Sequence, residues 1–79
     1  MKVPRDVNAG DLIKFLGSYG YAVIRQTGSH IRLSKKLDEG NHVITVPNHD
    51  PIKIGTFQNI VKDVCFVNNL NIKDFYNQF

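Results

Sequence analysis

The sequence contains one cysteine, one methionine, three prolines and no tryptophan. A single cysteine excludes an internal disulfide and a zinc site built from several cysteines, and it is typical of a reducing compartment. No hydrophobic run approaches the roughly 18 residues of a membrane-spanning helix, and the first residues lack the apolar core of a signal peptide. These absences predict a small, soluble, intracellular protein that has no membrane partner.

Several signatures of chemistry are missing as well. There is no phosphate-binding loop, no dinucleotide fingerprint and no defensible Cys–His or Ser–His–Asp spacing for a nucleophile. Cys65 lies next to the apolar stripe of an expected helix, so we interpret it as an inert, half-buried thiol. The histidines His30, His42 and His49 contain no close pair, so we expect no metal site and no cofactor. His42 is expected to be an ordinary surface residue.

The remaining composition is that of an ordinary globular protein. The chain has 79 residues, of which 42% are hydrophobic and 22% are charged, so we expect one folded domain over residues 1–79. A chain of this size buries about 63% of its unfolded surface, which is enough for one core but not for two lobes. Ten Lys and Arg against seven Asp and Glu give a net charge of +3. This excess favours a polyanionic partner without proving one.

Apolar residues recur at helical spacing in three segments. The spacing predicts a helix over Ala9–Tyr19 with Asn8 as its N-cap, and a second helix from an N-cap at Thr56 to about Phe66. A short third helix is expected after Asn71, which can cap it. The residues that define the three apolar faces are Leu12, Phe15, Leu16, Tyr19, Phe57, Ile60, Val61, Val64, Ile72, Phe75, Tyr76 and Phe79.

Three short strands are expected between the first two helices, over Tyr21–Thr27, His30–Ser34 and His42–Val46. Consecutive short strands with hairpin-length connections imply an antiparallel sheet. In the third strand we favour Ile44 and Val46 as the inward pair, although the alternate pair also fits. Helices from both ends of the chain can cover one face of this sheet and leave the other wet. The expected fold is therefore α+β, with the α-β-β-β-α(-α) layout of double-stranded-RNA-binding domains.

The second strand carries the most informative alternation. Ile31 and Leu33 fall on one face, while His30 and Arg32 fall on the other. If the apolar pair faces the core, the histidine and the arginine are held on the open face of the sheet. Gly28 supplies the positive φ angle of the preceding turn.

Several segments of the chain, taken together, resemble the HicA toxin family. These are the small mRNA interferases of HicA–HicB toxin–antitoxin pairs, and the resemblance runs from about Asp11 to Tyr76. The matching segments are Gly20-Tyr21, Arg25-Gln26-Thr27-Gly28-Ser29-His30, Thr45-Val46-Pro47-Asn48-His49 and Ile54-Gly55-Thr56-Phe57. The resemblance implies a double-stranded-RNA-binding-like fold, ribonuclease activity on mRNA and neutralisation by a HicB-type antitoxin. It also implies a single catalytic histidine in the Gly-Ser-His segment, which corresponds to His30.

The residues around His30 suit this chemistry. RNA cleavage without a metal needs a base for the 2′-hydroxyl proton and cations for the charge on the phosphorane. Histidine suits the first task, since the imidazole pKa in model peptides is about 6.5, so His30 is expected to be the general base, and a second role as general acid stays open. Arg32, and Arg25 if the register allows, can hold a phosphate. Gly28 and Ser29 are interpreted first as turn residues, with Ser29 also able to orient His30 through a hydrogen bond.

Further contacts to RNA phosphates are expected from Lys35 and Lys36 at a hairpin tip and from Lys53 before the second helix. Exposed lysines also serve solubility, and the acidic pair that follows Lys36 weakens that patch. His49, in the loop after the third strand, either helps to position RNA or is a plain loop residue.

Two other functional classes fit the same layout. One is a non-catalytic RNA-binding module, which would bind RNA in a salt-sensitive manner without cleaving it. The other is a protein-binding domain whose open sheet face receives a partner. The exposed edge of the third strand permits self-pairing without requiring it, so the oligomeric state stays open.

Overall fold

The computed structural model describes residues 2–79, so Met1 lies outside the described part. The elements are α1 (Ala9–Gly17), β1 (Ala22–Thr27), β2 (His30–Lys36), β3 (Asn41–Pro47), α2 (Ile54–Asn68) and α3 (Ile72–Tyr76). The strands form one antiparallel three-stranded sheet in the order β1-β2-β3. The predicted α+β fold and its α-β-β-β-α-α order are confirmed.

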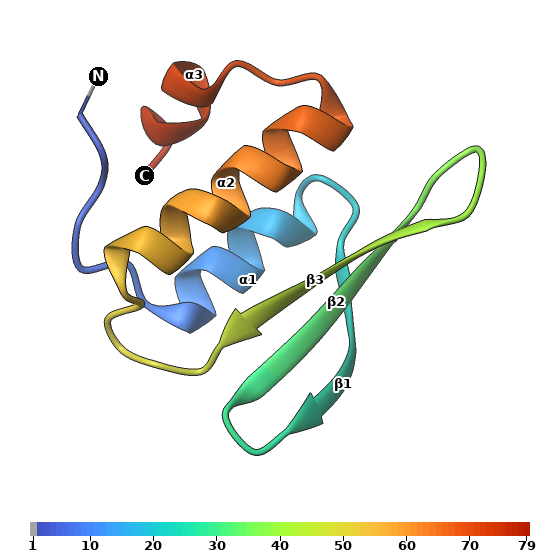
Figure 1. Cartoon of the computed structure of the whole chain (residues 1–79), viewed down its shortest axis with the longest axis horizontal. Coiled ribbons are helices and arrows are strands. Elements are labelled where there is room, and N and C mark those ends of the chain that lie inside the picture. The colour runs from blue at the N-terminus through green and yellow to red at the C-terminus, as the bar shows by residue number, and fades with distance from the viewer. Residues whose placement is uncertain (1) are drawn as a thin grey trace.

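The molecule has two layers, a sheet and the helices that pack on one of its faces (Figure 1). Residues from both layers meet in the core, where Leu12, Leu33, Val46 and Phe57 are at most 1% exposed. Burial of such side chains is the main favourable term in folding. No helix within residues 2–79 has the length and apolar character needed to cross a membrane. We call the helix-packed side of the sheet the covered face and the other side the open face.

The strand alternation sets which side chains reach the core. Ile31 and Leu33 of β2 are buried, and so are Ile44 and Val46 of β3, as the sequence predicts. Each apolar residue of β2 pairs with one of β3 in the register of the sheet. Because successive side chains of a strand point to opposite faces, the polar residues between them lie on the open face.

The helix starts differ from the predictions. Asn8 does precede α1, but its side chain makes no capping hydrogen bond. The Ala9 amide instead donates to Asp50 Oδ1 at 3.0 Å, across 41 residues of sequence. The prediction of Thr56 as the N-cap of α2 is wrong, because α2 begins at Ile54 after Lys53, without a side-chain cap. Local cap rules find only side chains that lie next to the helix start.

The other helix boundaries follow local rules more closely. α1 ends at Gly17, two residues before the predicted end, and Gly20 has a φ angle of 97° before the chain turns into β1. Asn69 ends α2 in the left-handed conformation at a φ angle of 55°. Asn71 Oδ1 accepts the Asp74 amide hydrogen at 3.1 Å, so the predicted cap of α3 is confirmed.

Candidate active site

His30 is the first residue of β2, at one end of the sheet. The turn before it has two residues, and Gly28 at its first position has a φ angle of 56°, the sign that a type II′ hairpin turn requires there. In the register of the sheet His30 lies between Thr27 of β1 and Pro47 of β3. Its side chain is exposed on the open face, as the alternation of β2 predicts.

Arg25 and Arg32 lie directly opposite each other in the next positions on the open face. A β-bulge in β1 produces the irregular register beyond this pair, because Val23 rather than Ile24 pairs with Leu33. A bulge leaves its extra residue unpaired and bends the strand locally. The sequence left the position of Arg25 dependent on register, and the structure places it across from Arg32.

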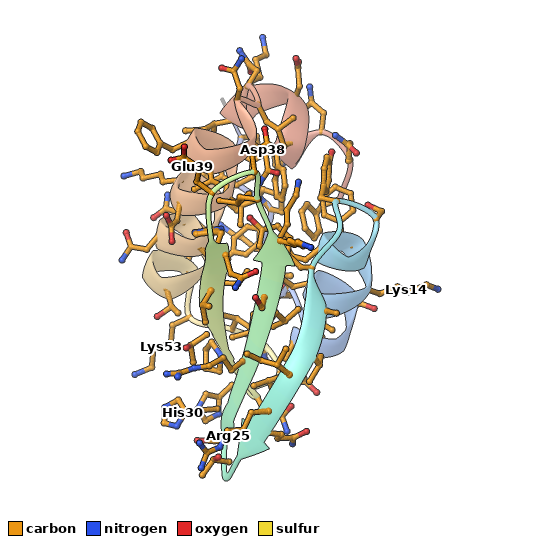
Figure 2. All side chains as sticks on the ribbon, turned by 90° about the vertical axis from the view of Figure 1, so that its right-hand side faces the viewer. Lys14, Arg25, His30, Asp38, Glu39 and Lys53 are labelled. Atoms are coloured by element: carbon orange, nitrogen blue, oxygen red, sulfur yellow. The ribbon has the colours of Figure 1, made fainter. Side chains whose placement is uncertain are left out.

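Two pockets adjoin His30. The first, which we call the arginine pocket, is lined by Arg25, Thr27, His30, Arg32 and Thr45. The second, which we call the histidine pocket, is lined by His30, Thr45, Pro47, His49, Lys53 and Thr56. His30 and Thr45 belong to both pockets, so the imidazole stands between two groups of cationic or titratable side chains. In Figure 2, Arg25 and His30 lie at one end of the sheet, with Lys53 on the His30 side.

The three lysines that were predicted to contact RNA phosphates do not lie together in the structure. Lys35 points to the covered face, where its Nζ atom donates to Asn68 Oδ1 and lies 5.8 Å from the centroid of the Tyr21 ring. Lys36 lies on the open face but is paired with Asn41, six positions along β2 from His30. Six strand residues span about 20 Å. Of the three predicted lysines, only Lys53 therefore joins His30 in a pocket.

The acidic residues lie at the far end of the sheet. Asp38 and Glu39 occupy the tip of the β2–β3 hairpin, opposite the end that carries His30 and Arg25 (Figure 2). Both Lys35 and Lys36 belong to β2, which extends two residues past its predicted end. The negative charges therefore do not dilute the field around the candidate site.

The interpretation of His42 as a surface residue is wrong. Its side chain is 12% exposed, and its Nε2 atom lies 3.1 Å from Asp63 Oδ2. Its Nδ1 atom lies 2.6 Å from the Tyr21 hydroxyl, which accepts a hydrogen bond of 2.9 Å from Asn68 Nδ2. Since the hydroxyl then has its own proton to give, the consistent tautomer of His42 accepts at Nδ1 and carries its proton at Nε2. This group lies on the covered face, away from His30.

Burial changes the acidity of two side chains near this network. Desolvation raises the pKa of the Tyr21 hydroxyl, with a smaller opposing contribution from the Asn68 hydrogen bond. Desolvation also raises the pKa of the Cys65 thiol, which is 2% exposed on α2. A buried thiol with a raised pKa is a poor nucleophile. Within residues 2–79, no three His, Cys, Asp or Glu side chains gather where a metal ion could be held.

Sequence reasoning missed three threonines that line the pockets. Thr27 and Thr45 belong to the arginine pocket, and Thr56 belongs to the histidine pocket. Thr45 lies between Ile44 and Val46, the pair that the sequence favoured as inward, and the burial of that pair places Thr45 on the open face. Thr56 was taken as a helix cap, and only the packing of α2 beside β3 brings it near His30.

The site combines a titratable imidazole with fixed positive charge. Guanidinium groups present several N–H donors in a geometry that matches phosphate oxygens. An imidazole next to a phosphate held in this way is placed to move a proton. The arrangement is therefore suited to bind a phosphate diester and to perform acid–base chemistry on it.

Comparison with protein families identifies a family model that matches the chain. The family model described as HicA toxin of bacterial toxin-antitoxin matches residues 9–64, which is more than half of the chain. The matched region contains β1, β2 and β3 and most of α2, and therefore includes both pockets. No curated protein and no solved structure matches the chain.

Proposed function

The chain belongs to the HicA toxin family of bacterial toxin–antitoxin systems, and from this membership we propose that it is an endoribonuclease that cleaves mRNA. In this proposal, cleavage arrests translation in the cytoplasm until a HicB-type antitoxin binds the toxin. The reaction is carried by side chains of the open sheet face, with His30 as the catalytic residue.

The observation that carries the proposal is the position of His30 beside Arg25 and Arg32. Like charges directly opposite each other on a sheet are destabilising. An anion bound between the two guanidinium groups removes that repulsion, and an RNA phosphate is an anion of the right geometry. The imidazole lines the same pocket as the two arginines. This supports a phosphate-binding site that has its proton-transfer group built in.

The proposed reaction begins at the ribose 2′-hydroxyl. His30 takes the hydroxyl proton, and the 2′-oxygen attacks the adjacent phosphorus to form a five-coordinate phosphorane. Arg25 and Arg32 stabilise the negative charge that develops on the non-bridging oxygens. Since DNA has no 2′-hydroxyl, the reaction is confined to RNA.

Contacts to the RNA backbone extend the site along the open face. Lys53 adds a positive charge in the histidine pocket, and Lys36 lies farther along the same face for a more distant phosphate. Phosphate contacts position a nucleic acid without reading its bases. We therefore expect a sequence-tolerant enzyme whose binding weakens with added salt.

The antitoxin is proposed to act by covering this face. A partner laid over β2 would block both pockets at once, because His30 lies between them. Val43, on the open face opposite Ser34, is 45% exposed and offers an apolar contact beside the charged pockets. A reading frame for a HicB-like protein next to the gene is the simplest supporting observation.

The test is to induce the parent protein and His30→Ala in bacterial cells, with purified proteins assayed on RNA in the presence of a metal chelator. We expect the parent to arrest growth and degrade mRNA, and His30→Ala to lose about 10²–10⁴-fold in cleavage rate. Lys14→Gln is the matched control, because Lys14 projects from α1 on another side of the molecule (Figure 2).

The outcome also separates the proposed enzyme from its main rival. A parent protein that binds RNA tightly but never cleaves it is a binding module, and the proposal then fails. Equal cleavage by the parent and His30→Ala would leave an enzyme but remove His30 from its mechanism.

A further inference from the structure

We infer that His49 is the general acid of the cleavage reaction and protonates the 5′-oxygen that leaves the phosphorus. This inference rests on the proposed function, in which His30 is the base. It adds a second catalytic histidine, supplied by the loop between β3 and α2.

The backbone holds that loop against the turn that carries His30. β3 ends at Pro47, the residue paired with His30, and His49 follows two positions later. The Asn48 amide donates to the Ser29 carbonyl oxygen at 2.6 Å, which joins the loop to the residue just before His30. The His49 amide donates to the Pro47 carbonyl oxygen at 2.9 Å, which tightens the chain at this point. The start of the loop is therefore fixed relative to His30.

The two imidazoles face the same space. Both histidines are exposed, and both line the histidine pocket together with Lys53. They come from different segments of the chain, His30 from the start of β2 and His49 from the loop after β3. In an in-line displacement the attacking and leaving oxygens lie on opposite sides of phosphorus. A phosphate bound in the pocket between the two histidines would have the base on one side of phosphorus and the acid on the other.

The other cation of the histidine pocket is less suited to be the acid. In model peptides a lysine ammonium group has a pKa of about 10.4, whereas histidine titrates at about 6.5. Catalytic acids work best when their pKa lies near the working pH. Lys53 is therefore assigned to the charge of the phosphate, and the imidazole of His49 is assigned to proton transfer.

The step balances as follows. His30 accepts the proton of the 2′-hydroxyl, and a bond forms between the 2′-oxygen and phosphorus. The bond between phosphorus and the 5′-oxygen breaks, and that oxygen takes a proton from the His49 imidazolium. The products are a 2′,3′-cyclic phosphate and a 5′-hydroxyl. His30 has gained one proton and His49 has lost one, and exchange with water restores both.

The experiment uses a leaving group that needs no acid. One linkage that the parent protein cleaves is mapped, and the oligonucleotide is made in two forms, with oxygen or sulfur as the bridging 5′-atom of that linkage. A thiolate leaves without being protonated far more readily than an alkoxide. The parent, His49→Gln and the control Lys53→Gln are compared on both substrates.

We expect His49→Gln to lose about 10²–10⁴-fold on the oxygen substrate and to cleave the sulfur substrate almost as fast as the parent. Lys53→Gln, which removes a charge but no acid, should slow both substrates by the same factor. If His49→Gln loses equally on both substrates, or loses on neither, the inference is wrong. If the parent cleaves no RNA, the proposed function fails and the inference fails with it.

The pH profile provides a second measurement. An acid must be protonated to act, so the kcat/KM of the parent should fall on the alkaline side of its optimum. His49→Gln should lose that alkaline fall and keep the acidic limb that belongs to the base. An unchanged alkaline limb in His49→Gln would contradict the assignment. Since the His49 side chain is exposed, the substitution should not disturb the fold, and the circular dichroism spectrum of His49→Gln should match that of the parent.

Discussion

Two arginines lie directly opposite each other on the open face of the sheet, and this pair is the least expected feature at the scale of single residues. Arg25 and Arg32 are direct cross-strand partners. Both are exposed, so water and salt weaken their repulsion without removing it. Sites that bind charged ligands often retain such locally unfavourable groups at the expense of stability. The pair therefore marks a place where binding and stability oppose each other.

We predict that Arg32→Gln stabilises the free protein while it impairs RNA cleavage. Removing one of two opposed cations should raise the free energy of unfolding by about 0.2–1 kcal/mol. Losing a donor to the phosphorane should lower kcat/KM by about 10²–10³-fold. Urea unfolding and cleavage of a defined RNA measure the two effects.

Lys53→Gln is the control for the stability half of this prediction, because Lys53 follows the strands and has no cross-strand partner. It should leave the urea midpoint unchanged. A destabilised Arg32→Gln, or one that cleaves RNA at the parent rate, would show that the pair has another role.

The errors at the residue scale have one physical origin. Lys35 and His42 are paired across β2 and β3 and share the covered face with Leu33 and Ile44. Lys35 follows the predicted strand His30–Ser34 and was expected at a hairpin tip, so the alternation was not applied to it, and His42 was expected to be an ordinary surface residue. Their partners come from α2, with Asn68 lying 33 residues after Lys35 in the chain. Long-range partners that make a polar side chain acceptable near the core cannot be read from local patterns.

At the scale of elements, a polar network fastens the sheet to α2 at the end away from His30. It runs from Asp63 through His42 to the Tyr21 hydroxyl, then to Asn68 and finally to Lys35. Asn68 also donates to the Val64 carbonyl oxygen at 2.8 Å, which holds its side chain against the last turns of α2. The hydrogen bonds of this network are partly buried, and a polar group removed from water is costly to leave without a partner.

We predict that Tyr21→Phe and His42→Ala each destabilise the fold, and that their effects are coupled. Losing the hydroxyl leaves His42 Nδ1 and an Asn68 proton without a partner, which costs about 1–3 kcal/mol. His42→Ala removes the other end of the same hydrogen bond. The double variant should be less destabilised than the sum, with a coupling energy of about 0.5–3 kcal/mol from urea unfolding.

Activity separates this network from the candidate site. Both single variants should cleave RNA at the parent rate at temperatures where they are fully folded, because the network lies on the covered face. Additive destabilisation would mean that the residues do not act as one network. A loss of cleavage in the folded variants would mean that the network on the covered face also affects the candidate site on the open face.

The boundaries of the elements show how far local rules reach. The apolar stripe of α2 was predicted correctly, with Phe57, Ile60, Val61 and Val64 all buried. Its start was not, because helix-start rules rely on a capping side chain and α2 has none. The β-bulge near Ile24 was also missed. A bulge has no distinctive residue here, yet it fixes which residue of β1 faces Arg32.

At the scale of the whole molecule, charge is segregated along the sheet. Asp38 and Glu39 lie at the hairpin tip, and Arg25, His30 and Lys53 lie toward the opposite end (Figure 2). The net charge of +3 therefore understates the field at the candidate site. The composition indicated a polyanionic partner, but only the fold shows at which end of the molecule the positive charges gather. An RNA strand should approach the sheet at the arginine end.

This segregation predicts that position, not total charge, controls the salt dependence of RNA binding. The comparison is made in the His30→Ala protein, so that the RNA stays intact. Lys53→Gln and Lys14→Gln each remove one positive charge, but only Lys53 lines a pocket with residue 30.

Each phosphate contact contributes about 0.7 to the slope of log K against log salt concentration for a single strand. Lys53→Gln should lower the magnitude of that slope by about this amount, and Lys14→Gln should leave it unchanged. Equal changes in the two variants would mean that the salt dependence of RNA binding is set by net charge alone. That result would contradict the assignment of the RNA backbone to the open face.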